Sequence, residues 1–308
     1  MPHTIFTAAD GNYSLQAQVL AASLARTQVN NSQLIVLGNG WKSRDLSRLK
    51  SLESERLSIE VRSVKDEEFK SVRLSRGFPI ATAYNILAPK YLLAGFDRLL
   101  YVDADTFVRK DLTDLFAQPV DGGVGACLDA HIGWVSSPSM WRPWREEGLA
   151  ASTPYLNTGV MLIDTREWNE RRLTEQTLDY LSRYELPCVD QDALNLVLRG
   201  DFTQLAPRYN AMPYHILRSF RYIDLVTPDS EIEEALTSPV ILHFHRSFLG
   251  KPWERGCIHP ARDTWRTLAN EIRPGWRKTY DLIGFGRRRA ARLARMLSID
   301  ERSRLPFR

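Results

Sequence analysis

The sequence predicts an α/β fold in which a mainly parallel sheet is flanked by helices. Along most of the 308 residues, short runs of apolar and β-branched residues alternate with stretches of helical periodicity. Strands that alternate with helices pair in parallel, and the helices cover both faces of the sheet. Two of the runs end in acidic or amide side chains, which suits a ligand site beyond the strand ends. With 44% hydrophobic and 25% charged residues, the chain is neither disordered nor a disulfide-stapled miniprotein.

Three strands and two helices follow one another from the N-terminus. Residues 3–8 are a strand that runs into a polar turn, and residues 14–26 are a helix with Ser14 as its expected N-cap. The helix carries a broad apolar face that includes Leu15 and Val19. A strand, a polar helix and an alternating strand follow at residues 33–38, 43–53 and 57–64. This order of elements is typical of a parallel sheet.

The middle of the chain continues the pattern. Residues 80–94 are expected to form a helix, and residues 98–105 form an apolar strand that runs into two acids. Further strands are expected at residues 123–129, 159–164 and 239–245. Because no internal repeat and no Gly/Ser linker interrupts this order, we expect one domain at residues 1–272.

The formal net charge of +4 is divided unevenly along the chain. Residues 273–308 contain 11 Lys and Arg and three acids, a charge of +8, so the preceding 272 residues carry −4. Helical spacing in residues 280–297 places apolar side chains such as Leu293 on one side and arginines such as Arg292 mostly on the other. This basic amphipathic tail favours contact with an anionic membrane surface over a merely solvated helix. No recognition motif supports a nucleic-acid partner.

Cysteines and targeting signals indicate the compartment. Cys127, Cys188 and Cys257 are odd in number and lack CxxC spacing, which disfavours disulfides and structural zinc. The N-terminus reaches Asp10 before an apolar run attains signal-peptide length. No stretch approaches the roughly 18 apolar residues of a membrane span. We therefore expect a cytoplasmic protein, peripheral on the inner face of the membrane where its tail makes contact.

Asp103 and Asp105 are the strongest local signal for chemistry. Four apolar residues precede them, so a strand delivers both carboxylates to a turn, where they can converge on one ion. Divalent cations such as Mn²⁺ or Mg²⁺ take oxygen ligands of this kind and keep positions open for phosphate oxygens. Taken alone the pair is weak, because such spacing occurs by chance and also serves turn capping. Asp190 and Asp192 repeat the spacing.

Other segments strengthen the interpretation of a metal and phosphate site. Alternation puts His243 and His245 on one face of the last expected strand, and a His at a strand end is a suitable third metal ligand. Lys251 follows closely in the sequence, as a cation that can contact a diphosphate whose oxygens bind the same metal ion. Asn157 comes just before the strand at residues 159–164, and Gln191 lies in an acidic helix start.

These segments, in this order, resemble glycosyltransferase family 8, the family that includes glycogenin and bacterial lipopolysaccharide α-galactosyltransferases. The resemblance covers about residues 4–253. It implies a GT-A fold, a UDP-glucose or UDP-galactose donor, Mn²⁺ or Mg²⁺ as cofactor, and retention of anomeric configuration. It also implies a saccharide or lipid-linked saccharide as acceptor.

The resemblance carries roles onto individual residues of this chain. It implies metal ligation by Asp103, Asp105 and one histidine. It implies donor binding by Ala8, Asp10, Asn12, Tyr13, Asp103, Ala104, Asp105, Asn157, Gly250 and Lys251. Beside the reactive face of the sugar it places Asp190, Gln191 and Asp192, with Lys251 on the leaving diphosphate. Either Asp190 or Asp192 forms a glycosyl intermediate, or the acceptor attacks from the front face; the sequence leaves both open.

Two positions depart from the family pattern. The family places an Arg where this chain has Ile86, so either Arg73 or Arg76 compensates or the choice of sugar differs. The family's histidine-to-lysine spacing is altered as well, which makes both His243 and His245 candidates. We favour His243 because it directly follows the apolar run.

The loop at residues 131–148 is a candidate acceptor platform or lid, with Asp129 just before it as a further contact. Asp129, Trp134 and Trp141 are the candidate contacts, because aromatic faces stack on sugars; the tryptophans could equally fill a core. Two other classes compete with the transferase. A sugar-nucleotide nucleotidyltransferase would carry a Gly-rich phosphate loop near the N-terminus, and a non-catalytic carbohydrate-binding relative would be expected to lose its acids. The sequence has no such loop and keeps both acidic segments.

Overall fold

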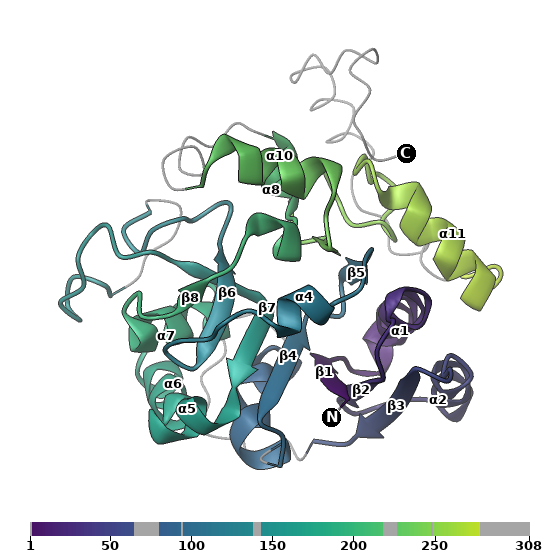
Figure 1. Cartoon of the computed structure of the whole chain (residues 1–308), viewed down its shortest axis with the longest axis horizontal. Helices are drawn as coiled ribbons and strands as arrows, with labels where there is room; N and C mark the ends of the chain where they lie inside the picture. The colour runs from purple at the N-terminus through teal and green to yellow at the C-terminus, as the bar shows by residue number, and fades with distance from the viewer. Residues whose placement is uncertain are drawn as a thin grey trace.

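The computed structural model describes residues 2–64, 80–93, 95–137, 143–217, 227–247 and 249–277. Its centre is a seven-stranded sheet of order β3-β2-β1-β4-β7-β6-β8 (Figure 1). Its strands are β1 (His3–Ala8), β2 (Ser32–Leu37), β3 (Leu57–Arg62), β4 (Arg98–Val102), β6 (Val124–Leu128), β7 (Leu156–Asp164) and β8 (Thr203–Gln204). A two-stranded sheet pairs β5 (Thr106–Val108) with β9 (Ile241–His243).

Most neighbouring strands of the large sheet are parallel. β1 pairs in parallel with β2 and β4, β2 with β3, and β6 with β8, whereas β7 is antiparallel to both β4 and β6. The mixed, mostly parallel sheet with flanking helices confirms the predicted α/β fold class. Because β7 runs in the opposite direction, its first residues lie at the same edge of the sheet as the last residues of β1 and β4. The topology thus gathers Ala8, Asp103 and Asn157 at one edge.

Helices cover both faces of the sheet (Figure 1). The α-helices are α1 (Ser14–Thr27), α2 (Ser43–Lys50), α3 (Tyr84–Leu87), α4 (Thr113–Phe116), α5 (Thr165–Glu170), α6 (Leu173–Arg183), α7 (Val189–Leu198), α8 (Pro213–Leu217), α10 (Asp229–Thr237) and α11 (Arg262–Ile272). Short 3₁₀ turns stand at Gly11–Tyr13, Ile80–Ala83 and Pro207–Asn210.

Alternation along the strands divides the core into two layers. Ile5 and Leu34 pack with side chains of α1, α2 and α4 on one face of the sheet. Phe6 and Ile35 pack with α3, α5, α6 and α7 on the other face. Adjacent residues of a strand point to opposite faces, so runs such as Ile5–Phe6 must be apolar throughout when both faces are covered.

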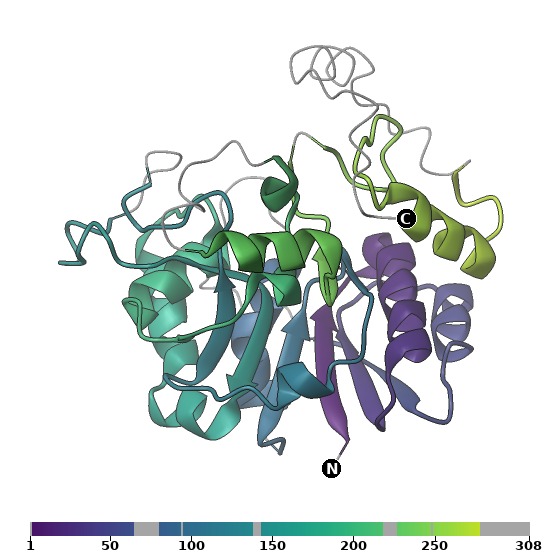
Figure 2. The same cartoon turned by 45° about the horizontal axis from the view of Figure 1, so that its top comes forward.

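Helix α1 is buried on two sides, which explains why its apolar face is so wide. Leu20 and Leu24 face the sheet, while Leu15 and Val19 pack against Trp265 of α11. Figure 2 shows α11 at the end of the molecule away from the N-terminus, beside α1. Trp276 continues this cluster, because its ring lies 5.4 Å from that of Trp265 at 82°. The packed body therefore extends through Trp276.

Three sequence expectations about the elements were wrong. The N-cap of α1 is Tyr13, without a side-chain cap, because the chain enters α1 through a 3₁₀ turn that Asp10 already caps. The helix expected at residues 80–94 is a 3₁₀ turn, the short α3 and a π-helical turn at Ala88–Leu92. Pro89 lies at the start of that turn and has no N–H to continue α-helical bonding. The last expected strand ends at His243, so His245 lies beyond it.

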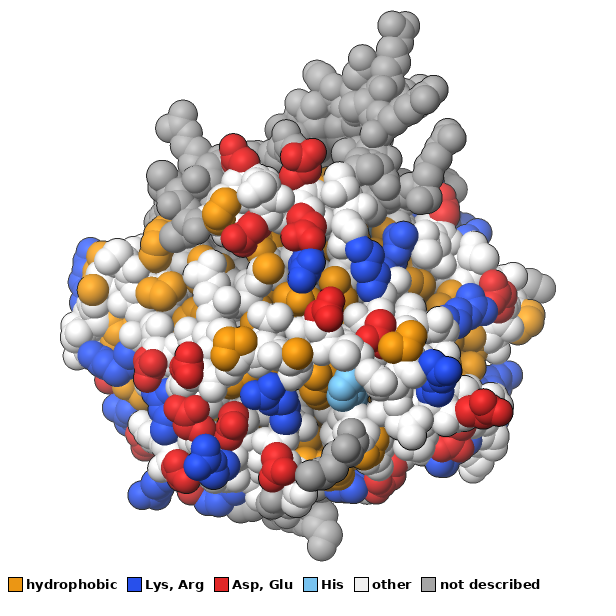
Figure 3. Space-filling view, viewed as in Figure 1, with side chains coloured by type: hydrophobic (Ala, Val, Ile, Leu, Met, Phe, Trp, Pro, Cys, Tyr) orange, Lys and Arg blue, Asp and Glu red, His pale blue; other side chains and the backbone are white. Residues whose placement is uncertain are grey.

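Several sequence predictions fall outside the described residues. They concern Arg73, Arg76, Trp141 and the greater part of the basic tail. Within the described part of the chain, no helix combines the length and apolar character needed to cross a membrane. On the face in Figure 3, acidic and basic side chains are both scattered over the surface.

Candidate active site

The acidic turn after β4 is fixed by backbone hydrogen bonds. The Asp103 N–H donates to the Gly159 carbonyl of β7 (2.8 Å), and the Thr106 N–H closes the turn on the Asp103 carbonyl (3.1 Å). The Thr106 hydroxyl donates to the same carbonyl (2.7 Å). The Phe244 N–H donates to the Asp105 carbonyl (2.9 Å), which ties the turn to the end of β9. Residues that are far apart in the sequence are thereby brought to one place.

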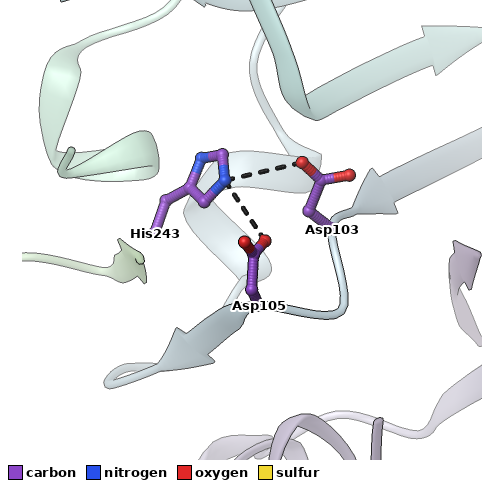
Figure 4. A group of neighbouring side chains, drawn as sticks. All are labelled: Asp103, Asp105 and His243. Atoms are coloured by element: carbon purple, nitrogen blue, oxygen red, sulfur yellow. Dashed lines mark ion pairs between the residues drawn. The ribbon is translucent and has the colours of Figure 1, made fainter. Parts of the chain in front are cut away.

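Asp103, Asp105 and His243 converge on a common point (Figure 4). The His243 Nε2 lies 3.5 Å from Asp103 Oδ2 and 3.3 Å from Asp105 Oδ1. One candidate ligand atom from each residue lies within 4.8 Å of the other two. Two carboxylate oxygens and one imidazole nitrogen, with further positions left for water or phosphate, fit Mn²⁺ or Mg²⁺. His245 stands farther back, its ring 5.6 Å from that of His243.

Lys251 supplies a cation beside this cluster. Its Nζ forms an ion pair with Asp105 Oδ2 and lies 5.4 Å from the centre of the Trp253 ring. Burial alone would raise the pKa of Asp105, but the charges of Lys251 and His243 hold it below its ordinary value. The Asp105 charge in turn raises the pKa of Lys251 against its own burial. The pair is therefore fully charged at neutral pH.

A side chain of the preceding strand, β4, orients the Asp103 carboxylate by a hydrogen bond. Tyr101 lies in β4, two residues before Asp103, and its hydroxyl donates to Asp103 Oδ1 (2.6 Å). Enclosure in the protein, and then the negative charge of Asp105, raise the pKa of Asp103. Burial, followed by the Asp103 charge, also raises the pKa of Tyr101, which keeps its hydroxyl protonated as a donor. The sequence did not single out Tyr101, although period two would have marked it.

Asp190 lies at the start of α7, where its carboxylate accepts a hydrogen bond from an amide. Among the ion pairs of the described residues, none includes Asp190; the Asn85 amide donates to its Oδ2 (2.8 Å). Burial raises the pKa of Asp190 to about 7. Ile86, where the family has Arg, is fully buried in the core layer of α3. Asn85 on α3 therefore contacts Asp190, whereas its neighbour Ile86 points into the core.

Gln191 and Asp192 point to different surroundings. Gln191 Oε1 accepts from the Asn157 amide (3.0 Å) and the Thr158 N–H (3.2 Å) at the start of β7. Asp192 is fully buried, and its oxygens accept from the Tyr155 hydroxyl (2.6 Å) and the Cys188 N–H (2.7 Å). These contacts favour a role for Asp192 in holding the loop before α7 rather than in contacting a substrate.

The residues predicted for the nucleoside lie around the end of β1. Asp10 Oδ1 accepts hydrogen bonds from the N–H groups of Asn12 (2.9 Å) and Tyr13 (3.1 Å). Tyr13 is 39% exposed, and its ring lies 6.3 Å from that of Trp253, which also contacts Lys251. An exposed aromatic ring is thus connected to the charged cluster through one intervening tryptophan. Ala104 is buried within the acidic turn, while Gly250 adopts a φ of +72° just before Lys251.

The candidate acceptor residues are only partly placed. Asp129 is 3% exposed and accepts from the N–H groups of His131 (2.8 Å) and Ile132 (2.9 Å). Burial alone would raise the pKa of Asp129, but nearby His245 and the hydrogen bonds that the carboxylate accepts lower this pKa. Trp134 is half-buried and bridges to Pro154. The carboxylate of Asp129 therefore faces inward.

A mostly parallel sheet with an acidic, metal-ligating cluster at its strand ends is typical of the GT-A fold. The chain belongs to glycosyl transferase family 8, whose family model matches residues 4–257. General stress protein A of Bacillus subtilis (strain 168) is 26% identical over 288 residues, which cover 86% of this chain and 96% of that protein. A lipopolysaccharide 1,2-glucosyltransferase of Escherichia coli is 28% identical over 274 residues, covering 87% of this chain and 77% of the relative.

A solved structure supports the fold independently of these sequences. The galactosyltransferase LgtC, in complex with donor and acceptor sugar analogues, superimposes with a TM-score of 0.74 at 23% identity. The superposition covers 90% of this chain and 99% of LgtC. At this level of identity the likeness establishes the GT-A fold.

Proposed function

We propose that this glycosyltransferase moves galactose or glucose from a UDP-sugar to a saccharide or lipid-linked saccharide, with Mn²⁺ as cofactor and with retention of configuration. The observation that carries the proposal is the convergence of Asp103, Asp105 and His243 beside Lys251 at the strand ends. The family supports nucleotide-sugar chemistry. The Escherichia coli relative, a lipopolysaccharide glucosyltransferase by name, supports a saccharide acceptor.

Each residue has a distinct part in this proposal. Asp103, Asp105 and His243 would hold a divalent cation, which when bound supplies positive charge against the diphosphate. Tyr101 keeps the Asp103 carboxylate oriented through its hydrogen bond. Lys251, enclosed and already charged, stabilises negative charge on the departing phosphate oxygen. Because the groups are fixed before the donor binds, little reorganisation is needed at the transition state.

Asp190 is the group we propose for the sugar itself. Its ionised carboxylate would stabilise the positive charge that develops on the sugar ring during transfer with retention. Although burial disfavours the charge by raising the pKa of Asp190 to about 7, about half of these carboxyl groups are still ionised at pH 7, and the ionised fraction grows as the pH rises further. Gln191, a neutral amide, is held by Asn157 and Thr158 and would orient the donor rather than attack it.

Release of UDP from a panel of UDP-sugars in the presence of Mn²⁺ tests the reaction class. We expect turnover by the wild type and its loss in Asp103→Ala and Asp105→Ala. Asp263→Ala is a matched control, because Asp263 is an exposed acid on α11 whose removal should leave turnover unchanged. No turnover of any UDP-sugar, or turnover that survives both substitutions, would contradict the proposal. Proton NMR of the product distinguishes retention from inversion.

We further propose that the basic tail at residues 273–308 places the enzyme on the inner, anionic face of the membrane. Of the charge of +8 in residues 273–308, residues 279–308 carry +5 (eight Arg and three acids), and this charge supports the proposal. Cosedimentation with vesicles that contain anionic lipid should depend on residues 279–308 and weaken with salt. Equal binding of the full and the shortened chain would contradict the membrane assignment without affecting the catalytic one.

A further inference from the structure

A chain of buried side-chain hydrogen bonds runs behind His243 to Asp129. Asn210 Oδ1 lies 3.0 Å from His243 Nδ1, and Asn210 Nδ2 lies 2.9 Å from Asn157 Oδ1. Asn157 Nδ2 lies 2.8 Å from Asp129 Oδ2, to which Gln191 Nε2 also donates (3.1 Å). Asn210 is fully buried, and Asn157 is 1% exposed. These five residues, called here the Asp129 chain, connect the back of the metal-ligand candidate to a carboxylate.

The direction of every bond in the Asp129 chain follows from its fixed ends. The ionised Asp129 carboxylate can only accept, so Asn157 must turn its NH₂ toward it. The Gly159 backbone N–H, which can only donate, lies 3.0 Å from the other Asn157 atom and marks it as oxygen. Asn210 must therefore present its NH₂ to Asn157 and its oxygen to His243. The His243 hydrogen consequently lies on Nδ1.

This assignment has a direct consequence for the opposite side of the imidazole. A neutral ring with hydrogen on Nδ1 carries its lone pair on Nε2. Nε2 is the atom that faces Asp103 (3.5 Å) and Asp105 (3.3 Å). The lone pair thus points to the place where the two carboxylates converge.

We propose that Asn210 is a positioning residue for metal binding, whose side-chain oxygen fixes the tautomer and orientation of His243. This inference rests on the proposed function, because it requires that Asp103, Asp105 and His243 bind a divalent cation. The Asp129 carboxylate terminates the chain and aligns both amides, so Asp129 supports the metal ligand from the far side. Partners that orient a histidine in this way strengthen it as a ligand.

The backbone gives Asn210 a fixed distance from His243. Asn210 ends the 3₁₀ turn that starts at Pro207, and the next residue, Ala211, is bonded to β9 on both sides. The Ala211 N–H donates to the Ile241 carbonyl (2.9 Å), and the His243 N–H donates to the Ala211 carbonyl (3.0 Å). Asn210 and His243 therefore stand on directly paired segments, and neither can shift without the other.

The affinity for Mn²⁺ alone tests the inference without turnover. It is measured from the electron paramagnetic resonance signal of the free ion. Asn210→Leu keeps the volume but removes the acceptor for Nδ1–H, and we expect a loss of Mn²⁺ affinity of about 10- to 100-fold. Asn210→Asp restores an oxygen acceptor for Nδ1–H but loses the hydrogen bond to Asn157 Oδ1, so it should recover only part of that loss. Gln18→Leu is the matched control, because Gln18 is another fully buried amide, bonded to the Asp45 carbonyl in α2, and should leave the affinity unchanged.

Long-range ¹H–¹⁵N spectra of histidine-labelled wild type provide a second readout that does not depend on any variant folding. We expect neutral His243 to carry its hydrogen on Nδ1 in the wild type. Hydrogen on Nε2, or equal Mn²⁺ affinity of the wild type and a folded Asn210→Leu, would overturn the inference. Absence of Mn²⁺ binding in the wild type would instead contradict the proposed metal site itself, and the two failures are therefore distinguishable.

Discussion

Replacement of Asp190 by Asn should stabilise the protein, and increasingly so as the pH rises. Asp190 is 9% exposed, and burial raises its pKa from an ordinary 3.8 to about 7 in the folded chain. The folded state therefore holds a proton that the unfolded state releases between these two pH values. Stability falls with rising pH wherever the folded state binds more protons. Asn cannot ionise, so the variant escapes this loss.

The magnitude follows from the two pKa values. Between about pH 4 and pH 7, each pH unit lowers the unfolding free energy of the wild type by about 1.4 kcal/mol relative to a variant with a neutral side chain. The total loss above pH 7 is about 4 kcal/mol. The hydrogen bond from Asn85 survives the substitution, because the amide oxygen of Asn can accept it. Any remaining packing difference is independent of pH. The slope of the difference with pH is therefore the diagnostic quantity.

Urea denaturation of the wild type and of Asp190→Asn between pH 5 and 8 measures this slope. The difference in unfolding free energy should widen by roughly 2 to 3 kcal/mol in favour of the variant over that range. Asp129→Asn is the matched control with the opposite sign, because the pKa of Asp129 is lowered and its carboxylate accepts four hydrogen bonds. That variant should be less stable at pH 7 and should approach the wild type as the pH falls. A difference for Asp190→Asn that is constant or shrinks with rising pH would refute the reasoning.

Three further substitutions test other parts of the site and the fold. A Cβ at position 159 would lie 2.3 Å from His243 Cε1 and 2.7 Å from its Nδ1. Gly159→Ala should therefore displace His243 and weaken Mn²⁺ binding, measured by calorimetry, at least tenfold. Unchanged affinity would contradict the placement of His243. Lys251→Met should lower kcat for UDP release by about 100-fold or more, and a loss below threefold would remove Lys251 from the leaving-group role. Trp265→Ala, at a fully buried ring between α1 and α11, should cost about 3 to 5 kcal/mol in chemical denaturation, whereas a cost below 1 kcal/mol would mean that α11 contributes little to the body.

Local patterns predicted much of the fold and the elements that carry the site. The strand before Asp103 and the strand that ends at His243 were both readable as apolar runs, because their side chains are buried. The pairing of β5 with β9 was not readable, since the contact joins residues more than 130 positions apart and only the folded chain sets it. Pro89 was visible in the sequence, but its effect on the helix at residues 80–94 was missed.

Residues that act through other residues gave the weakest sequence signal. Asn210 and Asn85 are single amides outside any motif, and only their contacts with His243 and Asp190 reveal them. Asp192 lies inside an acidic motif, but its carboxylate accepts hydrogen bonds from Tyr155 and from the loop backbone. Here the motif marked a residue whose contacts are structural. Spacing indicates which residues are near a site, whereas the direction of a side chain depends on packing around it.

Equilibrium binding of UDP, measured by titration calorimetry with Mn²⁺ and again with EDTA, tests the central claim of a metal-dependent donor site most directly. The account predicts tight binding to the wild type only with Mn²⁺, and its loss when Asp105 is replaced by Ala. UDP affinity that is equal in Mn²⁺ and EDTA, or unchanged in Asp105→Ala, would contradict a donor site organised by Asp103, Asp105 and His243.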